Sequence, residues 1–222
     1  RVYIPHYLTL WRRFVNYNDY GRNDARTVHA LINTLIPNIG MRYDKEMVYG
    51  YEPVPIAAPL VLEGLMTLEL DRGEPNGSRL MSILNGTTLV QAQEEDVYHA
   101  RLKPLATYGG MNAYANRDSL PLAWLVRSVR RVEGRRRLQA VLTDPNFVPA
   151  QEAIVTLGKD GANAEELVGL EGAEVSVTPS HSVVIQEKTE HKFVFNVDTG
   201  DRPAMLLVSL AAYPGWRATC DG

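Results

Sequence analysis

The densest group of charged residues in the sequence is a run of arginines that shares one short stretch of chain. A guanidinium group can hold a phosphate through two parallel hydrogen bonds, so this group could contact anionic lipid headgroups or a lipid-linked phosphate. Charge runs also form solvated strand edges and helix starts, and here Glu133 and nearby acids offset part of the charge. Both interpretations stay open. The arginines are Arg127, Arg130, Arg131, Arg135, Arg136 and Arg137.

Aromatic residues beside turns form a second candidate group, which would suit the binding of a sugar. The apolar C–H face of a pyranose stacks on Trp and Tyr rings, and binding residues often lie in loops. The alternative for Trp216 is a buried place at the end of a β-sandwich core. The candidate binding residues are Tyr49, Tyr51, Tyr213, Trp216 and Arg217.

No catalytic residue is assigned from the sequence. Glycoside hydrolysis needs two carboxyl groups about 5 to 10 Å apart in a cleft. Asp44 and Glu46, or the acids at 94–96, are available, but among 26 acidic residues such clusters arise by chance. The sequence also contains no G-x-S-x-G, P-loop or G-x-G-x-x-G motif, so a freestanding hydrolase is disfavoured.

Composition argues against several further classes of protein. A net charge of −3 and a pI near 6.0 give no overall field that would attract nucleic acid. The single cysteine, Cys220, and five scattered histidines match no zinc-ligand spacing, so no metal or cofactor is expected. No stretch reaches the roughly 18 uncharged apolar residues that a membrane helix needs. The Asn-Gly-Ser and Asn-Gly-Thr runs at 76–78 and 85–87 are interpreted as turns.

The elements that would position the arginines belong to a mixed α/β domain over residues 1–160. Apolar residues at helical spacing predict a first helix that ends at Pro37, and a second helix is expected over 56–70. A polar loop over 71–78 follows, and then β-prone runs at 87–92, 99–102, 111–115, 123–132 and 152–157. Between the last two runs we expect an amphipathic helix that ends at Asp144 and Pro145, with Leu138, Val141 and Leu142 facing inward.

A Gly-, Asp- and Asn-rich linker at 158–166 separates this domain from a second one over 161–222. Alternating runs at 182–186, 191–197 and 205–210 predict an antiparallel sheet of a β-sandwich-like domain, with Phe193, Phe195 and Val197 on one face. Residues 216–220 are interpreted as a strand that returns after a Pro-Gly turn. The closing Asp221-Gly222 pair is a hairpin signal without a following strand, so we expect an excised piece of a longer chain with an incomplete sandwich. The fold class is therefore α+β.

Four segments in this order resemble the YfhO-like family of bacterial integral membrane proteins. Each segment is short, but together they span roughly residues 37 to 222. The chain departs from the family pattern at Leu122, Ala212 and Cys220, and Leu122 replaces an arginine. The segments are PNIGM with YGYEP at 37–53, ILNGTTLV at 83–90, YAN with LPLAWLV at 114–126, and YPGWRA with DG at 213–222.

The resemblance implies a place for the chain in a larger protein. Members are polytopic proteins related to glycosyltransferases that use a polyprenyl-phosphate sugar for cell-envelope glycosylation. Their catalytic aspartate lies on an early loop outside this chain, so no residue here inherits a catalytic role. The resemblance implies a domain on the extracytoplasmic face of the bacterial cell membrane, with the parent's membrane helices and an envelope glycan or lipid-linked sugar as partners. The alternative is a structural or protein-interaction module with no ligand of its own.

Overall fold

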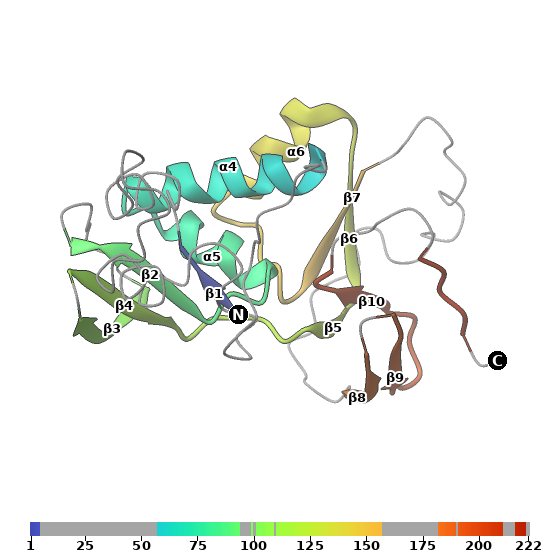
Figure 1. The fold of residues 1–222 in the computed structure, drawn as a ribbon. Coiled ribbons are helices and arrows are strands. Elements are labelled where there is room, and N and C mark those ends of the chain that lie inside the picture. The colour runs from blue at the N-terminus through green and yellow to red at the C-terminus, as the bar shows by residue number, and fades with distance from the viewer. Residues whose placement is uncertain are drawn as a thin grey trace.

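The computed structural model describes residues 1–4, 57–93, 99, 101–108, 110–156, 182–189, 191–210 and 216–220. Within these ranges the chain has an α+β fold, in which helices lie on one side of several mostly antiparallel sheets (Figure 1). The α+β class expected from the sequence is therefore confirmed. The expected helix that ends at Pro37 lies outside the described residues.

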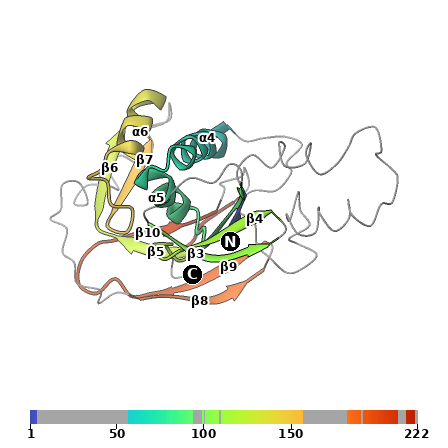
Figure 2. The ribbon, with the colours of Figure 1, turned by 90° about the vertical axis from the view of Figure 1, so that its left-hand side faces the viewer.

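The largest sheet has four strands in the order β1 (Val2–Tyr3), β2 (Thr88–Ala92), β4 (Met111–Asn116) and β3 (Leu102–Tyr108). β1 runs parallel to β2, and the other neighbours are antiparallel. Helices α4 (Ala57–Asp71) and α5 (Pro75–Ile83) cover one face of this sheet (Figures 1 and 2). The expected helix over 56–70 and the strands over 87–92 and 111–115 are thereby confirmed.

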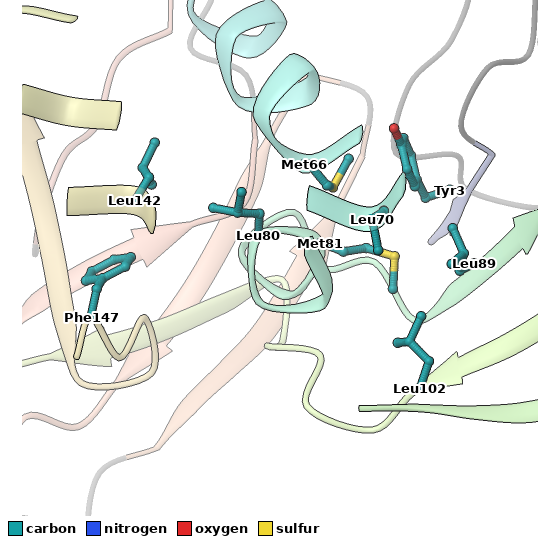
Figure 3. Packing of buried hydrophobic residues seen from close by; sticks show 9 residues of the cluster. All are labelled: Tyr3, Met66, Leu70, Leu80, Met81, Leu89, Leu102, Leu142 and Phe147. Atoms are coloured by element: carbon teal, nitrogen blue, oxygen red, sulfur yellow. The ribbon is translucent and has the colours of Figure 1, made fainter. Parts of the chain in front are cut away.

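Apolar side chains from both helices and three strands fill the space between these two layers. Met66, Leu70, Leu80, Met81 and Leu89 are fully buried there, and Figure 3 shows how they converge. Burial of this much apolar surface is the main favourable contribution to folding. The same cluster includes Tyr3, Leu102, Leu142 and Phe147.

Two expectations in this region are wrong. The segment 71–78 is not a loop throughout, because α5 begins at Pro75. Gly, Asn and Ser give its first turn a low helix propensity, and the helix forms because Leu80 and Met81 pack into the core. The strand expected at 99–102 lies later in the chain, as β3.

The connection between α4 and α5 is short because a glycine ends α4. Gly73 has φ of +68°, and its N–H donates to Leu70 O while the N–H of Glu74 donates to Glu69 O, both at 2.9 Å. These two bonds satisfy carbonyls of the last helical turn and reverse the chain. The two helices then cross closely at Gly77, where an added Cβ would lie 2.7 Å from the backbone nitrogen of Leu70.

The second unit is a βαβ arrangement of β6 (Ser128–Val132), α6 (Gly134–Thr143) and β7 (Glu152–Thr156), in which the two strands are parallel. α6 confirms the expected amphipathic helix. Leu142 is buried, and Leu138 and Val141 pack against the main core. The crossover is made by the helix, as parallel strands require.

The strand expected over 123–132 is divided in two at Arg127, because its halves have different partners. β5 (Ala123–Val126) pairs with β10 (Met205–Val208), whereas β6 pairs with β7. β8 (Val183–Lys188) and β9 (Phe193–Val197) pair only with each other among the described strands. The last three strands therefore do not share one antiparallel sheet, and 216–220 form no strand.

The β5–β10 pair builds a second core from distant parts of the sequence. Trp124, Val126 and Val129 are buried in it, and Met205 and Leu207 of β10 pack against them. The indole N–H of Trp124 donates to Pro149 O at 3.0 Å, which satisfies its polar group inside this core. Residues on both sides of the 158–166 segment thus contribute to one core.

We predict that Gly77→Ala destabilises the protein by about 1–3 kcal/mol, because the new methyl group overpacks the α4–α5 crossing at Leu70. Urea unfolding measured by circular dichroism would report the change. The matched control is Gly64→Ala in α4, where a Cβ meets nothing within 4 Å. That change should stabilise by about 0.5–1 kcal/mol through helix propensity. Equal effects of the two substitutions would contradict the close crossing.

Candidate functional site

Of the candidate binding residues, Trp216 and Arg217 are described, and both are exposed. Tyr49, Tyr51 and Tyr213 lie outside the described residues. Trp216 is 45% exposed, so the alternative of a buried place at the end of a sandwich core is wrong. The indole instead lies on the surface beside β9.

Trp216 extends a row of aromatic rings on one face of β9. Its ring centroid is 5.9 Å from that of Phe193, with the ring planes tilted by 48°. Phe193 and Phe195 follow each other on the same face, with centroids 6.2 Å apart and planes within 9° of parallel. Ile185 of β8 lies directly opposite Phe195. We call Phe193, Phe195 and Trp216 the aromatic strip.

The aromatic strip offers an apolar surface with polar groups at its margin. An exposed indole face can stack on the C–H face of a sugar ring, and the exposed Arg217 next to it can donate hydrogen bonds to hydroxyl or acidic groups. Sequence reasoning placed the two phenylalanines on one strand face but did not count them among binding residues. Their spacing at i and i+2, next to a turn-borne tryptophan, was the signal that could have identified them.

The arginines of this group differ in what they contact. Arg127 and Arg130 bind other parts of the chain. Arg130 on β6 forms ion pairs with Glu152 of β7 at 2.8 Å and with Asp144 after α6 at 3.0 Å. These contacts tie together all three elements of the βαβ unit. Arg127 donates to Thr199 O at 2.8 Å and so joins the β5–β6 corner to the segment after β9.

The ion pairs of Arg130 also shift the pKa of its own guanidinium and the pKa of Asp144. The hydrogen bond that Arg130 donates to Glu152 is the largest cause that raises the pKa of the Arg130 guanidinium, and the one to Asp144 adds to it. The pKa of Asp144 is lowered chiefly by the backbone N–H of Asn146, which donates to Oδ1 at 2.9 Å, and next by Arg130. Arg130 is thus engaged with carboxylates of its own chain.

Arg135, Arg136 and Arg137 differ from the other arginines, because all three are exposed in the first turn of α6. Positive charge at a helix N-terminus opposes the helix macrodipole, and the preceding Glu133 makes no side-chain cap there. Arg131 on β6 is half-buried. The exposed triplet is the part of the group that solution anions can reach.

The expected turn at 76–78 is wrong, because Asn76 lies in α5 and holds the end of α6. Its Nδ2 donates to Thr143 O at 3.0 Å and to Glu69 Oε2 at 3.2 Å. One turn later, Arg79 donates to Leu142 O at 3.1 Å, to Phe147 O at 2.9 Å and to Pro145 O at 3.2 Å. Together they satisfy two carbonyl groups that the C-terminus of α6 leaves unpaired and two more in the loop that follows.

Segments that carry the family resemblance also contact one another. Asn85, with φ of +54°, donates to Leu120 O at 2.6 Å. The buried Asn116 donates to Ser82 Oγ at 2.9 Å and to Gly86 O at 3.0 Å. The segments at 83–90, 114–116 and 120–126 therefore meet at one hydrogen-bonded junction. Their polar side chains serve the fold there, and the turn expected at 85–87 is confirmed.

Among the described residues there is no group of three His, Cys, Asp or Glu side chains that could hold a metal ion. The same part of the chain contains no helix long and apolar enough to cross a membrane. The acids at positions 44, 46 and 94–96 lie outside the described residues. Comparisons with protein-family models, curated proteins and solved structures found no match.

We predict that Arg79→Lys destabilises the protein by about 2–3 kcal/mol, because an ammonium group cannot reach the separate carbonyl groups that the planar guanidinium satisfies. Thermal and urea unfolding would measure the loss. Arg72→Lys is the control, since Arg72 is exposed and lies 4.0 Å from its acidic neighbour Glu69. It should change stability by less than about 0.5 kcal/mol. A similar loss in both variants would contradict the capping role of Arg79.

We predict that Arg130→Met lowers stability by about 1–2 kcal/mol, whereas Arg136→Met changes it by less than about 0.5 kcal/mol. Removing Arg130 leaves Glu152 and Asp144 without their shared cation. Urea unfolding at neutral pH distinguishes the two variants, and a loss on substitution of Arg136 as large as that of Arg130 would contradict the division of the arginines.

The Arg130→Met variant should also change how stability depends on pH. A carboxyl group with a lowered pKa stabilises the fold above its ordinary pKa of 3.8, and this contribution is lost as pH falls through the lowered value. Stability should therefore fall with acid below about pH 4. The fall should be smaller in Arg130→Met, since part of the lowering comes from Arg130.

Proposed function

We propose that this chain is a non-catalytic extracytoplasmic part of a polytopic bacterial membrane protein resembling the YfhO-like family. The parent would transfer a sugar from a polyprenyl-phosphate carrier to a cell-envelope acceptor. In this proposal the chain holds the acceptor glycan on the aromatic strip. The observation that carries it is the exposure of Trp216 beside Phe193.

The exposed indole supports glycan contact because its accessible face offers apolar surface that a ligand can cover. Its burial would remove a large apolar area from water, at about 25 cal/mol for each Å². A pyranose ring offers an apolar face of matching size and hydroxyl groups at its rim. Arg217, the next residue, is exposed and can meet those hydroxyl groups or an acidic sugar.

The resemblance supports an architectural contribution rather than a catalytic one. Asn85 and Asn116, two polar side chains of the matched segments, hold turns and loops together. Each amide donates to acceptors of its own chain. A catalytic centre would therefore belong to another part of the parent protein.

The exposed arginine triplet of α6 supports a contact with anionic groups. In the proposed setting the anion is a lipid headgroup or the phosphate of the sugar carrier. A guanidinium can bind either through paired hydrogen bonds. The contact is proposed for Arg135, Arg136 and Arg137, since Arg127 and Arg130 are engaged within the chain.

The alternative function is a structural or protein-interaction module. It is favoured by exposed apolar side chains on the β8–β9 hairpin that a protein partner could cover, with Val184 at 54% and Ile185 at 41%. The two functions differ in what Trp216 does. A glycan-binding role requires the indole itself, whereas a bracing role requires the hairpin.

We predict that envelope oligosaccharides shift the indole N–H signal of Trp216 in a two-dimensional NMR titration, and that Trp216→Ala abolishes binding. The control is Tyr108→Ala, since Tyr108 is 73% exposed on β3 but outside the aromatic strip. Binding should persist in that variant. Buried Trp124 supplies an internal reference signal that should not move. No response of Trp216 to any glycan tested would refute the glycan-binding role.

A further inference from the structure

The β8–β9 hairpin has only two strands, yet it exposes apolar side chains on both faces. It lies at the edge of the molecule away from the helices (Figures 1 and 2). A two-stranded hairpin is marginally stable alone in water. Val184 and Ile185 are neighbours on β8 and so point to opposite faces, yet both are exposed.

The outer edge of β9 has regular, unpaired backbone groups within the described part of the chain. The N–H of Asp198 donates to Ser182 O, and the N–H of Thr189 donates to Lys192 O. Alternation along an antiparallel ladder then directs the backbone groups of Phe193, Phe195 and Val197 away from β8. No described strand pairs with them.

Two other described edges, those of β3 and β8, carry features that hinder such pairing. β3, the edge of the four-stranded sheet, carries Lys103 and Pro104 and has an irregularity next to Pro104. Charged residues, proline and bulges are the usual devices that block edge pairing. β8 has a similar irregularity between Ile185 and Glu187 and lies beside β5. β9 has none of these features over its five residues.

The charges that flank β9 are complementary about its centre. Phe195 lies midway between Lys192, just before the strand, and Asp198, just after it. In an antiparallel pair of two copies centred on Phe195, each lysine lies opposite the aspartate of the other copy. Phe193 would oppose Val197, and the two Phe195 rings would face each other.

We propose that the outer edge of β9 binds a second copy of this chain, through an antiparallel β9–β9 pair with its two-fold axis at Phe195. The outward backbone groups form the central hydrogen bonds, and two Lys192–Asp198 ion pairs set the register. The contact is self-complementary, as a two-fold interface requires. It is small, so the dimer is weak and depends on concentration.

A charge exchange tests the register. In sedimentation equilibrium of the full chain, Lys192→Glu or Asp198→Lys should weaken the dimer about tenfold, because like charges then face each other twice. The double exchange should restore it to within about threefold. The control is Glu187→Gln, which removes the partner of Lys192 within the chain at 2.6 Å and should leave the dimer intact. A monomer at every concentration up to millimolar, or no restoration in the double variant, would overturn the proposal.

Disulfide cross-linking tests the register of the β9–β9 pair directly. Val194 and Asn196 of opposite copies would form a non-hydrogen-bonded pair with Cα atoms about 4.5 Å apart, which a disulfide can bridge. In a Cys220→Ser background, Val194→Cys and Asn196→Cys proteins should cross-link when mixed. Each alone should cross-link poorly, because identical positions would be more than about 7 Å apart. Equal cross-linking of the mixture and the single variants would refute this register.

Discussion

The fold depends on one partly buried contact, in which the Arg79 guanidinium of α5 holds the end of α6 and the loop that follows it. Three carbonyl groups and the Asn76 side chain accept its hydrogen bonds, and the group lies 5.8 Å from the centre of the Phe147 ring. Burial lowers the pKa of Arg79, but arginine stays charged because its ordinary pKa is so high. The contact joins the helix layer of the four-stranded sheet to the βαβ unit. Without it the partly buried carbonyl groups of Leu142 and Phe147 would lose this donor.

A second set of contacts fixes the C-terminal strands to the rest of the fold. β10 returns to pair with β5, and its Met205 and Leu207 complete the core around Trp124. Arg127 then holds Thr199, which follows β9 closely in the chain. The β8–β9 hairpin is therefore anchored at the β10 end. Its aromatic strip lies on a surface whose position is set by the second core.

The local elements could be predicted from the sequence, whereas their partners could not. Helical spacing identified α4 and α6, and β-prone runs identified most strands. Helix α5 was missed because Gly77 weakens its helix propensity while allowing the close approach to α4. The pairing of β5 with β10 is non-local, and strand periodicity carries no information about the partner of a strand.

The candidate site was also predictable only in part, because residue type is local but exposure is not. Residue type identified Trp216 and the arginines, but exposure depends on tertiary contacts that a single sequence does not show. Arg130 and the exposed arginines of α6 have the same side chain and lie a few residues apart, yet the first meets two carboxylates. Asn85 and the buried Asn116 gave no signal beyond their place in matched segments.

The side chains of this chain fall into two groups. One group holds the fold together, and the other is exposed and available for binding. Asn76, Arg79 and Asn116 donate hydrogen bonds to backbone carbonyl groups elsewhere in the chain, so substitutions there act on stability. Trp216 and the α6 arginines contribute little to the described cores, and an arginine at a helix start even opposes the helix dipole. Side chains that a fold exposes at a cost to its stability are the ones in which a binding role is to be sought. In this chain those side chains lie on the aromatic strip and at the start of α6.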